Sequence, residues 1–164
     1  MTIHLDGPGV TIADVTAVAR QSESVELTAA AVERMAAARA VVEQLAEGAP
    51  KYGISTGFGA LATVSIPPDR RRALQVALIR SHAAGMGDPV EDEVVRAMVF
   101  LRARTLAFGN SGARPLVAQA MVDILNAGIT PIVPEYGSLG ASGDLAPLAH
   151  GALALLGEGD VVYG

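Results

Sequence analysis

Apolar residues in this chain recur every three or four positions, and a glycine or proline ends most of these runs. This spacing is typical of amphipathic helices with defined stops. Thr11 and Thr28 stand just before two of the runs and can cap them, because a threonine hydroxyl accepts hydrogen bonds from the free amides of a first turn. Helices are expected over residues 12–20, 29–47, 69 to the stretch "SHAAGMG" (81–87), 91–108, 115–127 and 144–156.

Strand signals are weak by comparison. No stretch alternates polar and apolar residues over more than a few positions, and only residues 3–5 and "ITPIVP" (129–134) look extended. The chain has 164 residues, the length of one domain, and shows no internal repeat. The sequence therefore predicts a mainly α fold with little strand, formed by residues 1–164 as a single helical unit.

The composition is unusually apolar. Hydrophobic residues make up 51% of the chain and charged residues only 18%, against a charged share of about 25% in typical soluble domains. The apolar residues never form the run of about 20 that a membrane-spanning helix needs. We therefore expect surface that is buried against other chains or against further parts of a longer chain.

Charge and residue counts exclude several classes of protein. The formal net charge of −5 argues against nucleic-acid binding, and the one basic run, Arg70-Arg71-Arg72, is expected on a solvated helix face. There is no cysteine, and the three histidines have no metal-ligand spacing, so no metal site is expected. Because the start "MTIHLDGPGV" has no secretory signal, we expect a cytoplasmic protein that does not bind membranes.

A long glycine-rich loop, "KYGISTGFGALATVSIPP" (51–68), interrupts the helices. Loops of more than about 12–15 residues in compact domains are usually functional or disordered. Tyr52 and Phe58 favour order, so we expect a functional loop.

The stretch "GSLGASGDLAP" (137–147) surrounds Ser142 with small residues. It lacks the elbow of serine hydrolases and the glycine patterns of nucleotide-binding loops. One interpretation is a plain turn, with Asp144 capping the next helix and Pro147 in its first turn. The other is chemical: the Gly143 amide can close onto the carbonyl two residues earlier, and dehydration of Ser142 then leaves an electrophilic alkene. Only small residues permit so tight a bend.

The triplet Ala141-Ser142-Gly143, followed by "DLAPL", resembles the signature of the aromatic amino acid ammonia-lyases. Three further stretches resemble that family in the same order: "YGISTGFG" (52–59), "SHAAG" (81–85) and "GNSGARP" (109–115). Many members have asparagine where this chain has Ser55. Since family subunits are several-fold longer, the resemblance implies the helical, bundle-like N-terminal portion of a subunit, with the C-terminal part absent.

The resemblance also implies a prosthetic group, 4-methylidene-imidazol-5-one, formed from Ala141, Ser142 and Gly143 with Asp144 in support. It implies neither a nucleotide nor a metal. Family members assemble as homotetramers that share their active sites among subunits. Because further residues of the family site (an asparagine, a second tyrosine, an arginine and a glutamate) belong to the absent C-terminal part, the isolated chain is expected to be inactive or nearly so. A non-catalytic helical association module is the alternative from a different class.

Roles for further residues follow from the same resemblance. Tyr52 would be the base that removes the substrate β-proton; because an ordinary phenol is a weak base at neutral pH, this requires an electropositive pocket. His82 and Gly59 would bind substrate. "SHAAG" is similar to the histidine-specific lyases, so L-histidine is the expected substrate and trans-urocanate the product. A tyrosine ammonia-lyase or aminomutase is the alternative, and attack through the amine or the ring stays open. His150 is expected to be structural or interfacial.

Overall fold

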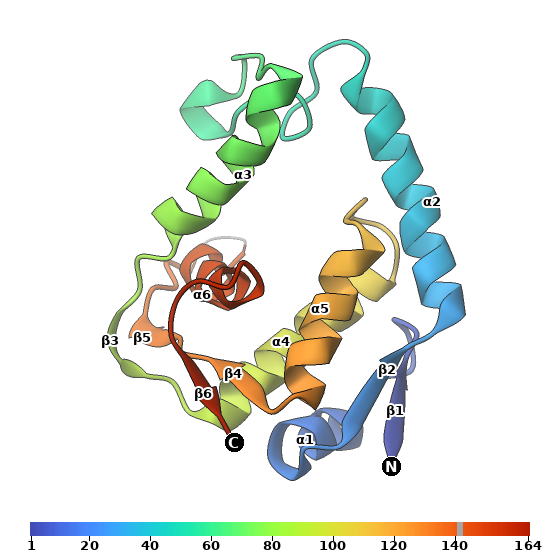
Figure 1. Ribbon diagram of the computed structural model, residues 1–164, viewed down its shortest axis with the longest axis vertical. Helices are drawn as coiled ribbons and strands as arrows, with labels where there is room; N and C mark the ends of the chain where they lie inside the picture. The colour runs from blue at the N-terminus through green and yellow to red at the C-terminus, as the bar shows by residue number, and fades with distance from the viewer. Residues whose placement is uncertain (141–142) are drawn as a thin grey trace.

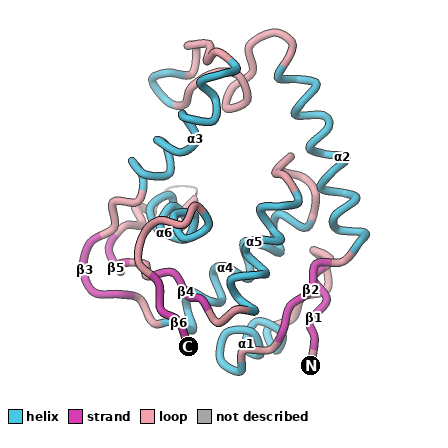
Figure 2. Tube along the Cα trace, in the orientation of Figure 1, coloured by secondary structure: helices cyan, strands magenta, loops and turns pink. Residues whose placement is uncertain are grey.

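The computed structural model describes residues 1–140 and 143–164. Within these residues the chain forms six α-helices, six short strands and one 3-10 helix (Figures 1 and 2). The helices are α1 (Ile12–Gln21), α2 (Ala29–Ala46), α3 (Pro68–His82), α4 (Asp92–Ala107), α5 (Pro115–Asn126) and α6 (Leu145–Leu155). The strands are β1 (Thr2–Leu5), β2 (Ser24–Leu27), β3 (Met86–Pro89), β4 (Ile129–Pro131), β5 (Pro134–Tyr136) and β6 (Val161–Tyr163), and the 3-10 helix is Gly59–Leu61.

The mainly α prediction is confirmed, and each predicted helix is present with its ends within a few residues of those expected. Local capping explains where α1 and α2 begin. Thr11 forms a full capping box with Asp14: its hydroxyl accepts from the Asp14 amide, and the Asp14 carboxylate accepts from the Thr11 amide. The Thr28 hydroxyl accepts from the Ala31 amide and caps α2.

The strands form three separate pairs. β1 and β2 are parallel, whereas β3 pairs with β5 and β4 with β6 in antiparallel fashion. β2 was not expected as a strand, because its alternation covers only four residues, with Val25 and Leu27 buried and their neighbours exposed. Asn126, at the end of α5, holds β2 in place: its side chain accepts from the Val25 amide at 2.9 Å and donates to the Val25 carbonyl at 2.8 Å.

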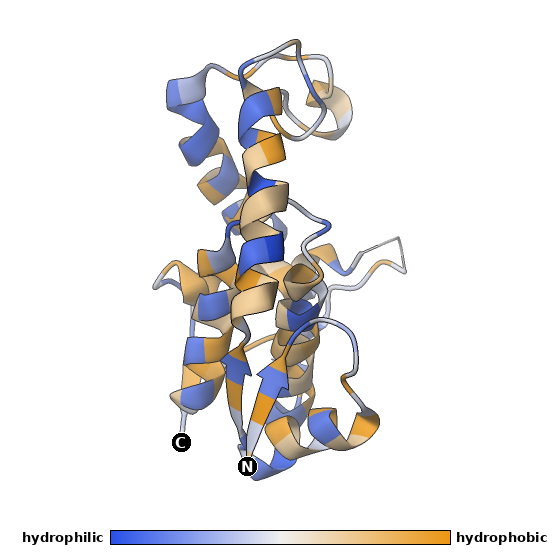
Figure 3. Cartoon of the chain, turned by 90° about the vertical axis from the view of Figure 1, so that its right-hand side faces the viewer, coloured by the Kyte–Doolittle hydropathy of each residue, from blue (hydrophilic) through white to orange (hydrophobic). Residues whose placement is uncertain are grey.

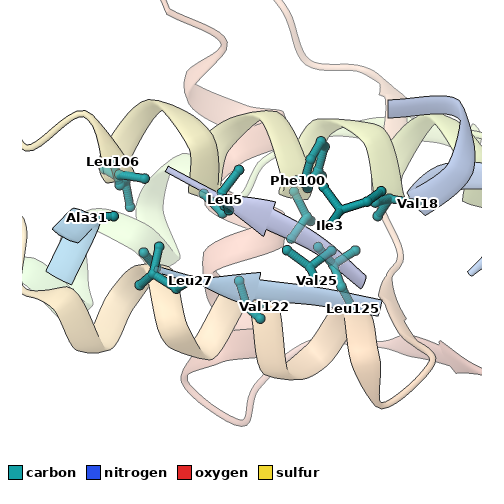
Figure 4. Close-up of a cluster of buried hydrophobic side chains, with 14 of the residues drawn as sticks. Ile3, Leu5, Val18, Val25, Leu27, Ala31, Phe100, Leu106, Val122 and Leu125 are labelled. Carbon is teal, nitrogen blue, oxygen red and sulfur yellow. The ribbon is translucent and has the colours of Figure 1, made fainter. Parts of the chain in front are cut away.

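The hydrophobic core lies between this strand pair and the helices α4, α5 and α1 (Figure 4). Phe100 from α4 is fully buried at its centre, together with Leu5 from β1 and Val18 from α1. Val122 contributes from α5. Burying side chains of this size contributes about 1.5–3 kcal/mol each. We call β1, β2, α1, α4 and α5 the base of the chain; it is the part with the most hydrophobic stabilisation.

Two helices extend away from the base. Figure 1 shows α2 and α3 far apart near the core and approaching each other at their far ends, where residues 47–67 join them. α2 buries only Ala31 and Met35, both in its first half, and no residue of α3 is buried. Figure 3 faces the side that α2 occupies, where apolar and polar residues alternate along the helix. Within the described part of the chain, no helix is long and apolar enough to cross a membrane.

An arginine ties the two extended helices together. Arg71 donates from Nε to the Ile66 carbonyl at 3.1 Å and from Nη1 to the Ala46 carbonyl, at the end of α2, at 3.2 Å. The expectation of a solvated basic run is therefore wrong for Arg71, which is half-buried, while Arg70 and Arg72 are exposed. The carbonyls at a helix end lack partners within the helix, and this guanidinium supplies one.

Candidate active site

Glycines in the left-handed region flank the predicted prosthetic-group triplet. Ala141 and Ser142 lie outside the described residues, but Gly140 before them has φ +65° and Gly143, the third member of the triplet, has φ +110°. Side chains other than glycine rarely adopt these angles. Among the described residues, no atom lies within 4 Å of a Cβ built on either glycine. Glycine at these two positions leaves the backbone free to bend as cyclisation requires, so the residues present fit the group.

Asp144 stands at the N-cap position of α6, but its side chain makes no capping hydrogen bond. The capping part of the prediction is therefore wrong. A cap residue bonds the amide of the second or third helical residue, and the third residue here is Pro147, which has no N–H. The Asp144 carboxylate instead accepts a hydrogen bond from the Ser138 hydroxyl, which links the two sides of the loop.

His82 is the last residue of α3, and its ring is held by that helix. Its Nδ1 lies 2.8 Å from the Leu78 carbonyl oxygen and 3.1 Å from the Ser81 hydroxyl. Because a carbonyl can only accept, Nδ1 carries the proton and the neutral ring keeps a lone pair on Nε2. The half-buried His82 therefore offers an acceptor to any N–H or O–H group that reaches Nε2.

The segment after His82 lies against α6. The Gly85 amide donates to Nε2 of His150, on α6, at 3.0 Å. β3 follows directly and pairs with β5, in which Met86 lies opposite Tyr136. The end of "SHAAG" and the helix that follows the triplet, distant in sequence, are therefore neighbours in the fold.

Tyr52 and Gly59 form a second group. The Gly59 amide donates to the Tyr52 hydroxyl oxygen at 3.4 Å, and the Tyr52 and Phe58 rings meet edge to face with centroids 6.0 Å apart. Tyr52 is 64% exposed, so its hydroxyl is accessible from solvent. The amide directs the positive end of its dipole at the phenolic oxygen.

Ser55 has a structural role that the sequence did not reveal. It is buried, and its hydroxyl accepts from the Lys51 amide at 2.9 Å. The Ile54, Ser55 and Thr56 amides all donate to the Lys51 carbonyl. Thr56 and Ser65 form an isolated bridge across the segment. Tyr52 therefore lies in a compact turn that is held together by its own local hydrogen bonds.

The two groups lie at opposite ends of α3 (Figure 1). Residues 51–61 lie by its N-terminal end, whereas α6 packs at its C-terminal end, where Arg80 pairs with Glu158 at 2.6 Å. Fifteen residues of α-helix span about 22 Å. One chain therefore brings the C-terminal end of α3 against α6, but it does not bring Tyr52 there.

The "GNSGARP" turn joins α4 to α5 and packs against α2. A Cβ on Gly109 would lie 2.8 Å from the Arg34 Cβ, and one on Gly112 would collide with the Val42 side chain. The stretch is a helix-to-helix turn in which glycines permit the close approach. Among residues 1–140 and 143–164, no cluster of three side chains could hold a metal ion.

Comparison with known proteins identifies the family. A family model described as aromatic amino acid lyase matches residues 10–164. The chain belongs to the aromatic amino acid lyase family. A curated histidine ammonia-lyase of Streptomyces coelicolor is 60% identical to this family member over 160 residues, which are 97% of the chain.

Solved structures show the same helical fold. A histidine ammonia-lyase from Trypanosoma cruzi matches 99% of this aromatic amino acid lyase chain with a TM-score of 0.89 and 38% identity. A tyrosine aminomutase from Streptomyces globisporus matches 99% with a TM-score of 0.92 and 37% identity. The chain spans about a third of the length of the curated relatives it matches, 31% of the Streptomyces coelicolor enzyme.

Proposed function

We propose that the chain is part of a histidine ammonia-lyase, a carbon–nitrogen lyase that eliminates ammonia from L-histidine to give trans-urocanate. The observation that carries this proposal is the 60% identity to a histidine ammonia-lyase across nearly the whole chain. The Trypanosoma cruzi histidine ammonia-lyase and the tyrosine aminomutase are nearly equal in identity, at 38% and 37%, so these two structures do not separate the substrates. The 60% identity to the Streptomyces coelicolor enzyme is what favours histidine over tyrosine.

The prosthetic group would form from Ala141, Ser142 and Gly143. In this scheme the Gly143 nitrogen bonds to the carbonyl carbon of Ala141 with loss of one water, and Ser142 loses its hydroxyl and α-proton as a second. The bent backbone at Gly140 and Gly143 supports this assignment. The finished methylidene-imidazolone supplies an electrophile that activates the substrate for loss of ammonia.

Asp144 would assist the cyclisation. Its carboxylate adjoins the triplet and is free of a capping bond, so it can polarise the nearby backbone while the Ser138 hydroxyl holds it in place. A carboxylate that accepts hydrogen bonds from the amides of its own helix would be less available to polarise the cyclising backbone.

His82 would bind the substrate side chain. Its Nε2 lone pair can accept the N–H of a substrate imidazole, while the Leu78 carbonyl fixes the tautomer. A phenol could donate to the same atom, so this contact alone does not separate histidine from tyrosine.

Tyr52 would remove the β-proton of the substrate, with Gly59 beside it at the substrate. The Gly59 amide points at the phenolic oxygen, which favours the negative charge that a base of this kind must carry. Since this group lies a helix length from α6 within one chain, we propose that another subunit supplies it. The complete enzyme would then be a homotetramer, and the isolated chain would have little or no activity.

The experiment that tests this function starts with the intact mass of the purified chain. The same measurement is made on the complete enzyme, with all its subunits assembled. Loss of two waters, mapped by fragmentation to residues 141–143, is the expected result in that complete enzyme. Incubation of that enzyme with L-histidine, and separately with L-tyrosine, then identifies the substrate by the ultraviolet absorption of the product. Failure to turn over L-histidine in a dehydrated enzyme would refute the substrate. Urocanate production at full rate by the chain alone would refute the need for other subunits.

A further inference from the structure

A partly buried hydrogen bond joins two segments that the proposed site needs close together. The Gly85 amide donates to His150 Nε2 at 3.0 Å, across 65 positions of sequence. An amide N–H can only donate, so Nε2 must be the bare nitrogen and the His150 proton lies on Nδ1. Burial also lowers the pKa of this imidazole, which keeps the acceptor available at neutral pH.

The packing around this bond leaves no room for side chains. A Cβ on Gly85 would lie 3.0 Å from His150 Nε2 and 3.2 Å from the Pro134 Cβ. A Cβ on Gly137 would lie 3.0 Å from the Ala146 Cβ and 3.4 Å from the Gly85 Cα. The segment after α3, the end of β5 and the first turn of α6 therefore meet backbone to backbone, with His150 as the polar link.

A second polar link, between Arg80 of α3 and Glu158 just after α6, is weaker. Arg80 and Glu158 form a bidentate pair, but their side chains are 59% and 36% exposed. Exposed ion pairs of this kind contribute about 0–1 kcal/mol and are screened by salt. The His150 contact is less exposed and has a fixed direction, from the Gly85 amide to Nε2.

We propose that His150 is a positioning residue: through the Gly85 amide it holds the segment that follows His82 against the first turn of α6. This inference rests on the proposed function for its meaning, because His82 would bind substrate and α6 directly follows the prosthetic-group triplet. His150 then sets the distance between the substrate-binding histidine and the electrophile without touching either reactant.

Amide hydrogen exchange at Gly85, resolved to the single residue, tests the proposal on the chain itself. His150→Gln places a side-chain oxygen near the position of Nε2 and should keep Gly85 protected. His150→Phe keeps a ring of similar size without an acceptor, and should raise the Gly85 exchange rate about tenfold, the effect of losing one hydrogen bond. His4→Phe, the same change at an exposed histidine on β1, should leave Gly85 unchanged.

The Phe100 amide in the core serves as the internal reference for folding. If His150→Phe also raises the exchange rate of the Phe100 amide, the variant is not properly folded, and the smaller substitution His150→Leu is used in its place. Equal Gly85 exchange in the parent and a folded acceptor-free variant would overturn the proposal, as would failure of His150→Gln to restore protection. Intact mass and turnover judge the proposed function separately, so a chain that never loses water would refute that function while Gly85 exchange still decides the role of His150.

Discussion

At the scale of single residues, buried polar groups in this chain act mainly as links between elements. Arg96 of α4 is 6% exposed and donates to the Val18 carbonyl at 3.1 and 3.3 Å and to the Leu125 carbonyl at 3.4 Å. These carbonyls belong to the last turns of α1 and α5, where the helix dipole favours a cation. Burial lowers the pKa of Arg96, opposed by the charge of Asp92.

Replacing Arg96 tests this link. Arg96→Met keeps the aliphatic stem and removes the donors, and it should lower the free energy of unfolding by about 1–3 kcal/mol because two buried helix ends lose their partner. Urea unfolding followed by circular dichroism measures the change. Arg102→Met, at an exposed position of the same helix, should change stability by less than about 0.5 kcal/mol. Equal effects of the two substitutions would contradict the assignment.

His150 gives stability a defined pH dependence. Burial lowers its pKa in the folded chain below the value of about 6.5 for an unfolded histidine. Folding therefore favours the neutral ring, so its contribution is complete above about pH 6.5 and is lost as the pH falls through the lower, folded-state value. In a plot of the urea midpoint against pH, His150→Gln should flatten the slope below about pH 6.5. An unchanged slope would refute the role of His150 in this pH dependence.

Carboxylates act in a separate, more acidic window. Hydrogen bonds from Thr28 and Arg34 lower the pKa of Asp6, bonds from Thr11 lower that of Asp14, and Arg80 lowers that of Glu158. Their contributions are present above about pH 4, the ordinary carboxyl range, and are lost below it. The effect of His150 on stability is therefore measured between about pH 4 and pH 6.5, where these carboxyl groups stay ionised.

At the scale of elements, glycines decide how closely helices approach. Gly112 has φ +66° and would collide with Val42 of α2 if it carried a side chain, whereas Gly157, with φ +74°, has nothing within 4 Å. Gly157→Ala should cost about 1–2 kcal/mol from backbone strain alone. Gly112→Ala should cost about 1–3 kcal/mol more through overpacking. Thermal unfolding of both variants measures the difference. Equal losses of stability would show that α2 moves to accommodate the added methyl group with no loss of free energy.

Arg71 should determine the order of residues 47–67. Arg71→Met removes its bonds to the Ile66 and Ala46 carbonyls, which leaves the segment between α2 and α3 with fewer constraints at its ends. Thermolysin should then cleave this segment several-fold faster, since cleavage follows local opening. Arg72→Met, an exposed neighbour, should leave the rate unchanged. Equal rates in both variants would contradict this role.

The elements also show how far the sequence could predict the structure. Helix ends were predictable because their signals are local, as in the caps at Thr11 and Thr28. β2 was missed because four alternating residues are too short a signal, and Asn126 is needed to hold it. The capping expectation for Asp144 failed because Pro147 removes an amide. The resemblance located the site motifs, but no local pattern predicts that His150 meets Gly85.

At the scale of the whole molecule, the apolar excess of the sequence corresponds to exposed surface on the extended helices. Val41 is 55% exposed and Leu45 38% exposed, four residues apart on one side of α2. α3 has no buried residue. Helices obtain most of their stability from a packed face, so α2 and α3 lack much of the packing that would stabilise them within one chain.

The isolated chain should therefore associate with itself. Sedimentation velocity over a range of concentrations is expected to show a reversible increase in size, and Val41→Lys should shift this to higher concentration by placing charge on the apolar side of α2. Ile12→Lys, which changes an exposed apolar residue on α1, is the control and should have little effect. A chain that stays monomeric at all concentrations would count against shared active sites.

The link between Asn126 and β2 has a consequence for synthesis on the ribosome. Val25 is made 101 residues before the side chain that holds its backbone, an interval of about 5–20 seconds at ordinary rates of elongation. Until residues 92–126 are made, β1 and β2 have no α4 or α5 to cover Val25 and Leu27. Until those helices are made, the strand pair is an uncovered apolar surface, to which a ribosome-associated chaperone could bind.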